Sequence, residues 1–238
     1  MFVRLAVVAV LNFAAAAGAT TSSEATVKPF HADYRVLRNG KAIGRATLSL
    51  RNTGDGVWEF DSHTHGTSGM ASLLGLDVTE KSTFRWHDGH PQGLKYHYDQ
   101  SAAIKSRTRD IEFDWENGTA AVRDGKKNRD LTLVPDAVDR SLVTVALMAD
   151  LQTHAPTLTY HVVHSNKISD EHYSRSDSES IELPAGRVEA VRIERDRSGS
   201  KRHTTSWFAP KRAWLPVKIE HVEKHGDTVT LELASQRD

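Results

Sequence analysis

The stretch Trp207-Phe-Ala-Pro210-Lys-Arg-Ala-Trp214-Leu-Pro216-Val-Lys-Ile219, near the C-terminus, decides how this chain is expected to fold. A strand pattern ends in an aromatic pair, a short turn follows around Pro210, and a second strand pattern leads away from it. Each proline lacks the N–H that a strand ladder would use, so both prolines belong at a corner or at the start of a strand. The stretch therefore predicts a β-hairpin, with the other strands of the chain lying beside it.

Alternating side chains predict those other strands. In Leu94–Asp99 and Ile111–Glu116 the apolar and aromatic residues share one face, and the charged residues share the other. Such one-sided strands are typical of an antiparallel sheet with one face in water. Asn39-Gly40 and later glycine turns mark hairpins between them. The same alternation recurs in four earlier segments: Tyr34–Leu37, Ile43–Leu50, Val57–Phe60 and Ser82–His87.

One segment breaks the alternation. Asp139–Leu151 spaces its apolar residues as a helix does, and Asp136 or Asp139 could cap its N-terminus after Pro135. One helix can cover many one-sided strands only if the sheet curls around it or onto itself. We therefore predict a mainly β protein: a strongly curved antiparallel sheet, an open or partly closed β-barrel, with a helix over about 139–151 packed at its mouth. A flat two-sheet sandwich is the alternative.

The N-terminus predicts export. Residues 1–19 combine a basic residue, a short apolar run and the small-residue site Ala17-Gly18-Ala19, which together form a secretory signal peptide with cleavage expected after Ala19. Residues 20–28 are small and polar and predict a flexible lead-in. Residues 29–238 show neither a linker nor a repeat and predict a single domain. No later segment has the roughly 20 apolar residues of a spanning helix, so we expect a periplasmic protein without a transmembrane segment.

Composition excludes several classes of protein. The chain has 31 basic and 31 acidic residues and no cysteine. Removal of residues 1–19 takes away one arginine and no acid, which leaves the mature chain close to neutral. A neutral surface argues against nucleic acid as a partner and against attachment to anionic membranes through a polybasic patch. The absence of cysteine excludes disulfides and a lipid-modified N-terminal cysteine, and a chain of this length can bury enough core without staples.

Histidine is abundant, with 13 copies. Two imidazoles at i and i+2 of a strand point to the same face and could reach one metal ion. The alternative is that these histidines face solvent in polar segments. No third ligand stands at a diagnostic spacing, so we predict no metal site and no cofactor. The closely spaced histidine pairs that could act as metal ligands are His63 and His65, His87 and His90, and His161 and His164.

Catalytic motifs are also missing from the sequence. Glu112, Asp114 and Glu116 alternate on one strand face, and glycoside hydrolysis needs two carboxyl groups about 5–10 Å apart. The same alternation describes an ordinary solvated face, which we favour. Residues 66–69 lack the Gly-x-Ser-x-Gly spacing of a nucleophile elbow, and no phosphate-binding loop occurs. We therefore expect no catalytic residues, and a non-enzymatic protein is favoured over an enzyme with an unfamiliar site.

Aromatic residues on the strands suggest a binding interior instead. A curled sheet with few helices can leave its lumen open, and an open apolar lumen holds a small hydrophobic ligand. The alternative is that the same side chains form an ordinary packed core. The glycine-flanked segment Gly66–Leu76 could supply a short helix or movable lid. The predicted ligand-lining residues are Trp58, Phe60, Met70, Leu73, Leu74, Phe84, Trp86, Tyr96, Tyr98, Trp115 and Trp207.

Several turn and hairpin residues together resemble the exported bacterial family of unknown function DUF3108, from about Tyr34 to the C-terminus. The family is similar in outline to periplasmic carriers of the lipoprotein-localisation (Lol) type, whose curved sheet and lid helices hold acyl chains. The resemblance implies no established activity and no catalytic residues. The residues that carry it are Tyr34, Asn39-Gly40, Ile43-Gly44, Ser82, Phe84, Phe113, Trp115, Asp139, Ser141, Leu183-Pro184, Gly186, Trp207, Ala209-Pro210 and Leu215–Ile219.

Three functions follow as hypotheses. The first is a non-enzymatic periplasmic protein that binds or carries a lipid or another amphipathic molecule of the cell envelope inside the curved sheet. The second is a protein that binds or processes envelope polysaccharide through exposed aromatic and acidic residues. The third is a structural or assembly partner in the envelope. An apolar hollow of about 300 Å³ or more would favour the first.

Overall fold

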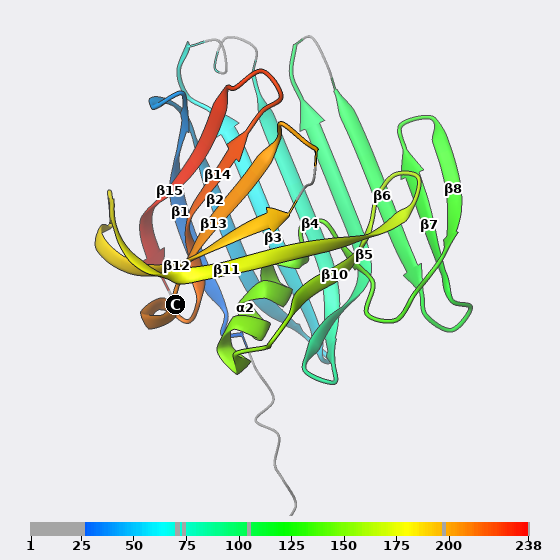
Figure 1. Cartoon of the computed structure of the whole chain (residues 1–238). Helices are drawn as coiled ribbons and strands as arrows, with labels where there is room; N and C mark the ends of the chain where they lie inside the picture. Colours follow the sequence, from blue (N-terminus) through cyan, green and yellow to red (C-terminus); the bar gives the residue numbers. More distant parts are fainter. Residues whose placement is uncertain (1–26, 70–71, 73–74, 104–105, 197–198, 238) are drawn as a thin grey trace, which may run out of the picture.

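A computed structural model describes residues 27–69, 72, 75–103, 106–196 and 199–237 of the chain. In this part, fifteen strands form one continuous sheet (Figure 1). The strands are β1 (Phe30–Arg38), β2 (Lys41–Gly54), β3 (Val57–Gly66), β4 (Asp77–His87), β5 (His90–Ser101), β6 (Arg107–Asp114), β7 (Thr119–Asp124), β8 (Lys127–Thr132), β9 (Val138–Asp139), β10 (Leu158–Val163), β11 (Ile168–Leu183), β12 (Gly186–Asp196), β13 (His203–Ala209), β14 (Leu215–Val222) and β15 (Thr228–Arg237).

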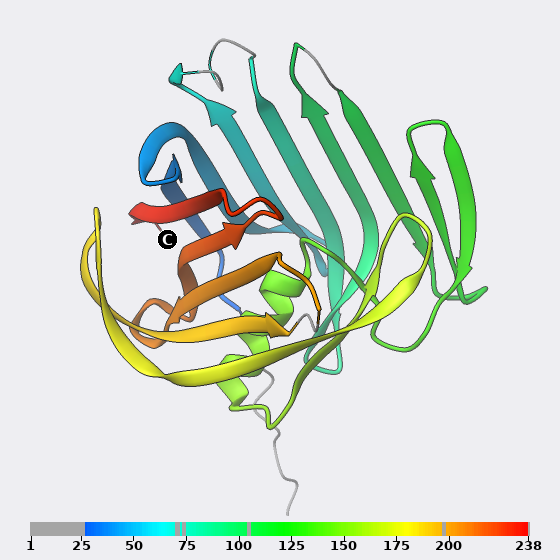
Figure 2. The same cartoon turned by 45° about the horizontal axis from the view of Figure 1, so that its top comes forward.

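The strand order is β8-β7-β6-β5-β4-β3-β2-β1-β15-β14-β13-β12-β11-β10-β9. Two runs of antiparallel hairpins meet where β1 pairs with β15, and a short parallel pair joins β9 to β10. Strands β8 and β9 end the order without pairing to each other, so the sheet curls but does not close (Figure 2). The prediction of a mainly β protein with a strongly curved antiparallel sheet is confirmed.

The β-hairpin predicted around Pro210 is present, between β13 and β14. Strand β13 ends at Ala209, and Pro210 begins a single 3₁₀ turn, η1 (Pro210–Arg212), where its missing N–H costs no ladder bond. The Trp214 N–H donates to the Ala209 carbonyl (3.0 Å) and closes the turn. Pro216 is the second residue of β14, and its carbonyl accepts a hydrogen bond from the buried hydroxyl of Tyr34 (2.7 Å).

The helix starts later than predicted. It is α2 (Val143–Thr153), rather than a helix from residue 139, because Asp139 still belongs to β9. Neither Asp136 nor Asp139 is the N-cap: that position is Leu142, and no side chain caps it. Asp139 instead accepts the backbone N–H groups of Ser141 and Leu142 (2.9 Å each) and fixes the turn that leads into the helix.

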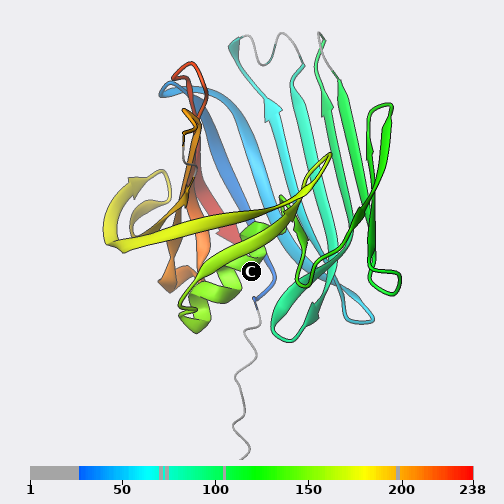
Figure 3. The ribbon, with the colours of Figure 1, turned by 45° about the vertical axis from the view of Figure 1, so that its right-hand side comes forward.

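Helix α2 lies inside the curl, near one end of the strands (Figures 2 and 3). The sequence suggested one apolar stripe, but almost every residue of α2 is buried, from Val143 to Leu151 with the exception of Thr144. A helix that is apolar all round belongs in the interior of a protein. The sheet therefore wraps around the helix, and the inward faces of its strands complete the core.

Buried side chains form two clusters. We call the larger the main core: it surrounds α2 and takes residues from β1–β4 and β10–β15. The smaller, the wing core, lies on β5–β8 and contains Tyr96, Ile111, Phe113 and Val122. Val163 at the end of β10 also packs into the wing core, because β10 and β11 run across the open side of the curl (Figure 3).

Candidate ligand cavity

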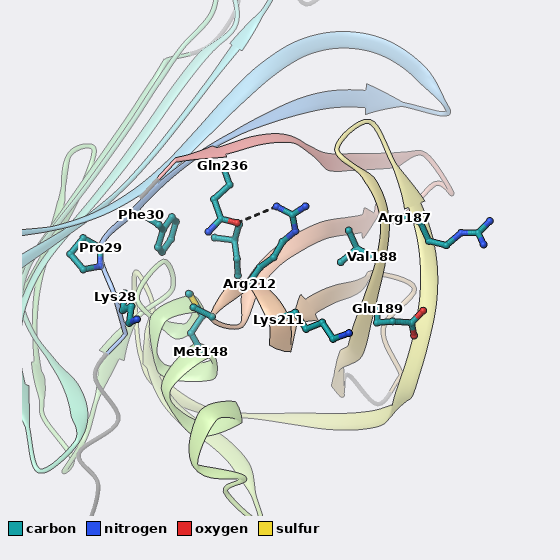
Figure 4. Close-up of a pocket in the computed structure, with 12 residues that line it drawn as sticks. Lys28, Pro29, Phe30, Met148, Arg187, Val188, Glu189, Lys211, Arg212 and Gln236 are labelled. Atoms are coloured by element: carbon teal, nitrogen blue, oxygen red, sulfur yellow. Dashed lines mark hydrogen bonds between the residues drawn. The ribbon is translucent and has the colours of Figure 1, made fainter.

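A cavity of about 1090 Å³ lies inside the curl, next to α2 (Figure 4). Five segments that are far apart in the sequence form its walls: the start of β1, the middle of α2, the start of β12, the turn around η1 and the end of β15. Ligand pockets in proteins typically enclose about 300–1000 Å³. The cavity is therefore large enough for a lipid-sized ligand.

One part of the wall is apolar and rigid. Phe30, Met148, Val188 and Leu215 are all buried, and each belongs to the main core. Met148 reaches the cavity from α2, while the other three are inward-facing positions of β1, β12 and β14. The apolar lining residues are Pro29, Phe30, Met148, Val188, Ala213 and Leu215.

The rest of the wall is mostly basic. Arg212 is half-buried, and its Nη1 donates to the side-chain oxygen of Gln236 at 3.5 Å, a long contact. Arg187 is neutralised by Glu182 (2.5 Å), and its side chain extends beyond β12, away from Arg212 (Figure 4). The polar lining residues are Lys28, Arg187, Glu189, Lys211, Arg212 and Gln236.

The predicted ligand-lining residues lie elsewhere in the fold. Trp58, Phe60, Phe84 and Trp207 are buried in the main core, and Trp86 packs against it. None of these five lines the cavity. Trp207 also has protein partners of its own. Its Nε1 donates to Glu179, and Lys218 lies over one face of its ring at 4.4 Å.

Of the remaining predicted residues, three belong to or pack against the wing core, and three lie outside the described residues. Tyr96 is buried in the wing core, and Tyr98 and Trp115 pack against it. Met70, Leu73 and Leu74 lie outside the described residues. Binding of a ligand by any of these side chains stays a prediction.

The sequence patterns do not predict the cavity residues, because they do not show which distant segments of the chain come into contact in the fold. One signal was present: Lys211 and Arg212 form a basic pair inside the hairpin turn that organises the chain. The turn is anchored on both sides of that pair. Pro210 begins it, and the ring of Trp214 packs edge-on against His154 at the end of α2 (centroids 6.3 Å apart).

A polar cluster with the buried Asp139 at its centre links β4 and β5 to the turn before α2. Asp139 is fully buried, and its Oδ1 accepts the hydroxyl of Ser82 (2.7 Å). Tyr96 donates to Glu80 (2.8 Å), and Arg140 lies 3.3 Å from the same carboxylate oxygen. Burial raises the pKa of Asp139 to about 6. Ser82 and Ser141 both donate hydrogen bonds to Asp139. These contacts give the three residues, which are among those that carry the family resemblance, a structural role.

A second hollow, of about 470 Å³, lies on the wing beside Trp115. The rings of Phe113 and Trp115 are stacked (centroids 6.0 Å, interplanar angle 8°). Two of the three acidic residues here already have partners: Glu112 contacts Arg123 (3.3 Å), and Asp114 accepts two hydrogen bonds from Asn117. These hydrogen bonds lower the pKa of Asp114. The carboxylates lie along one strand rather than across a groove from each other.

The histidine pairs considered as metal ligands have other partners nearby. The rings of His63 and His65 lie side by side (centroids 5.6 Å), and His63 bonds to Asp77 (2.9 Å). His161 bonds to Asp170 (2.7 Å). Among the described residues, no three histidine, aspartate or glutamate side chains gather as a metal site would require.

Together, an open sheet curled around one buried helix and a cavity beside that helix define a mainly β, barrel-like protein. The chain belongs to the DUF3108 family of proteins of unknown function, whose family model matches residues 30–234. Within the described residues, no helix is long and apolar enough to cross a membrane. A search of curated proteins finds no match.

Solved structures with a similar fold share little sequence with the chain. A β-barrel-like protein of the DUF1849 family from Brucella abortus has 9% identity and a TM-score of 0.55, covering 88% of this chain and 97% of its own. A lipoprotein candidate from Parabacteroides distasonis has 11% identity and a TM-score of 0.36, with 88% and 95% coverage. An exported-protein candidate with a YmcC-like fold from Bacteroides fragilis has 9% identity and a TM-score of 0.31, with 88% and 94% coverage. The first of these supports the shared fold and nothing more.

Proposed function

We propose that the chain is an exported, periplasmic, non-enzymatic protein that binds or carries an amphipathic molecule of the cell envelope in the cavity beside α2. The observation that carries this proposal is the cavity of about 1090 Å³ with an apolar wall on one side and a polar wall on the other. Export is supported by the signal-peptide pattern of residues 1–19.

The character of the wall favours binding over a packing defect. Phe30 and Val188 line the cavity and pack into the main core, with the buried side chains of Met148 and Leu215 behind the same wall, so the site is preformed. A preformed apolar wall stabilises a hydrophobic ligand by about 25 cal/mol for each Å² of apolar surface removed from water. Polar groups at the other side of the same cavity would orient that ligand.

The proposal is tested by native mass spectrometry of the chain without residues 1–19, after incubation with a bacterial envelope lipid extract. We expect one lipid to be retained per protein. The Gln236→Trp variant places a large ring in the cavity and should abolish retention. Its matched control is Ser235→Trp on the same strand, since Ser235 bonds outside the cavity to Asp33 (2.8 Å). Absence of retained lipid from the unmodified chain contradicts the proposal.

A second candidate function is polysaccharide binding at the wing hollow. The observation that favours it is the stacked Phe113–Trp115 pair beside three acidic residues, because sugar rings pack on aromatic faces. Trp115→Ala should then remove glycan-array signals while leaving lipid retention intact. An array without signal for the unmodified chain would exclude this candidate.

A further inference from the structure

We propose that the molecule held beside α2 is an anionic amphiphile, with its acyl chain against the apolar wall and its negatively charged head group at Lys28, Lys211 and Arg212. This inference rests on the proposed function and specifies its ligand class.

The charges of the wall carry the inference. Four basic residues and one acidic residue line the cavity, and Glu182 neutralises only Arg187. In the described part of the chain, no carboxylate forms an ion pair with Lys28, Lys211 or Arg212. The whole chain has a formal net charge of zero, so this local excess of positive charge does not follow from its composition.

Arg212 is the most informative of these residues. Arg212 is half-buried, and its guanidinium points into the cavity, where it donates to the neutral amide of Gln236 at 3.5 Å (Figure 4). Removing a cation from water without an opposite charge is costly, so an anion bound here would be stabilised strongly. A guanidinium also binds phosphate and carboxylate groups through two parallel hydrogen bonds.

The positions of the basic residues give the ligand an orientation. Lys211 and Arg212 come from the η1 turn, which is closed by the Trp214 N–H bond, and Lys28 precedes β1 on the other side of α2 (Figure 4). Met148 lies between these two groups. A head group that contacts both basic groups therefore leaves its acyl chain beside α2, against the apolar wall that includes Phe30 and Val188. A free phosphate ion would use the basic groups alone and leave the apolar wall in water.

The inference is tested with three probes that share one oleoyl chain and differ in head group: lysophosphatidylglycerol (anionic), lysophosphatidylcholine (zwitterionic) and monooleoylglycerol (uncharged). Inorganic phosphate is the fourth probe. Titration calorimetry below the micellar concentration should show the anionic probe binding about tenfold or more tightly than the other two lipids, and phosphate binding far more weakly than all three.

The double variant Lys211→Gln/Arg212→Gln should bring the affinity for the anionic probe to within about threefold of the zwitterionic one. The matched control is Lys126→Gln/Lys127→Gln, which removes the same charge from the exposed β7–β8 turn and should leave the preference unchanged. Equal affinities for all three lipids would overturn this inference and leave the proposed function standing. Failure of all three lipids to bind would overturn both, and phosphate binding as tightly as the anionic lipid would overturn the amphiphile assignment.

Discussion

The main core and the wing core are built from strands with the same one-sided pattern, yet in the described part of the chain the main core borders a cavity of about 1090 Å³ and the wing a hollow of about 470 Å³. On the wing, aromatic side chains such as Tyr96 and Phe113 fill the space between β5–β8 and the end of β10. Beside α2, the apolar side of the cavity wall has one ring, that of Phe30, and its other described members are aliphatic residues such as Met148, Val188 and Leu215. Large rings fill volume, so the cavity lies where the inward positions carry few of them.

The comparison also separates two uses of charge. On the wing, acidic and basic side chains pair with each other, as Asp124 does with Arg107 (2.6 Å) and Arg109 (3.0 Å). Beside the cavity, Lys211 and Arg212 have no such partner among the described residues. Paired charges are satisfied within the protein, whereas unpaired ones are available to a ligand.

The largest expected effect concerns packing. Phe84→Ala in the main core, where the ring is fully buried, should lower the free energy of unfolding by about 3–5 kcal/mol. Phe113→Ala on the wing should cost about 2–3 kcal/mol, because this ring borders the wing hollow. Urea denaturation of both variants measures the difference. Equal losses would mean that the wing is packed as tightly as the main core.

The next effect concerns the polar cluster around Asp139. Burial raises the pKa of Asp139 from 3.8 to about 6, so the folded state binds this proton more tightly than the unfolded state. The stabilisation is complete below about pH 4 and is lost as the pH rises to about 6, a change of about 3 kcal/mol. Asp139→Asn, which keeps an acceptor for Ser82, should remove this loss.

Denaturation at pH 4 and pH 7 checks that prediction. Relative to the unmodified chain, the Asn variant should gain about 2–2.5 kcal/mol between the two pH values, because a small part of the effect is already present at pH 4. The same pH dependence in both proteins would show that Asp139 is not the titrating group.

A smaller effect should locate the cavity without any ligand. Val217 and Val188 are both buried in the main core, but only Val188 lines the cavity. Val217→Ala should cost about 2–3 kcal/mol, whereas Val188→Ala should cost about 1 kcal/mol because fewer packing contacts are lost. If the two substitutions cost the same, the space beside Val188 is filled.

The smallest effect concerns a paired charge on the wing. Hydrogen bonds from Arg107 lower the pKa of Asp124 to about 2, so its stabilisation is present above about pH 4 and lost as the pH falls through 2. Solvent screens this partly exposed cluster, and Asp124→Asn should cost only about 0.5 kcal/mol at pH 7. A loss of several kcal/mol would show that the wing depends on this charge cluster.

The sequence predicted the strands and turns better than the tertiary contacts between them. Alternation in Leu94–Asp99 and Ile111–Glu116 predicted β5 and β6, and the prolines at 210 and 216 predicted the corner between β13 and β14. These features depend on neighbouring residues. The start of α2 was placed too early because β9 is only two residues long and pairs with β10, which no local pattern reveals.

The cavity could not be predicted because it depends on how far the sheet curls. Where the sheet curls tightly, inward-facing aromatic residues pack into a solid core. Where it curls less, the same residues line an open cavity, and the sequence pattern is identical in both cases. Among the described residues, Phe30 is the one aromatic residue in the cavity wall, and Arg212 joins it from a position 182 residues later in the chain. Side chains so distant in sequence lie close together because β1 pairs with β15 and joins the two hairpin runs.

The most direct test of the account is the mass of the native protein after exposure to envelope lipids. The account predicts one retained lipid with an anionic head group, lost in Gln236→Trp and kept in Ser235→Trp. A protein that stays lipid-free, or one in which both tryptophan variants retain lipid equally, would contradict the assignment of the cavity beside α2 as the binding site.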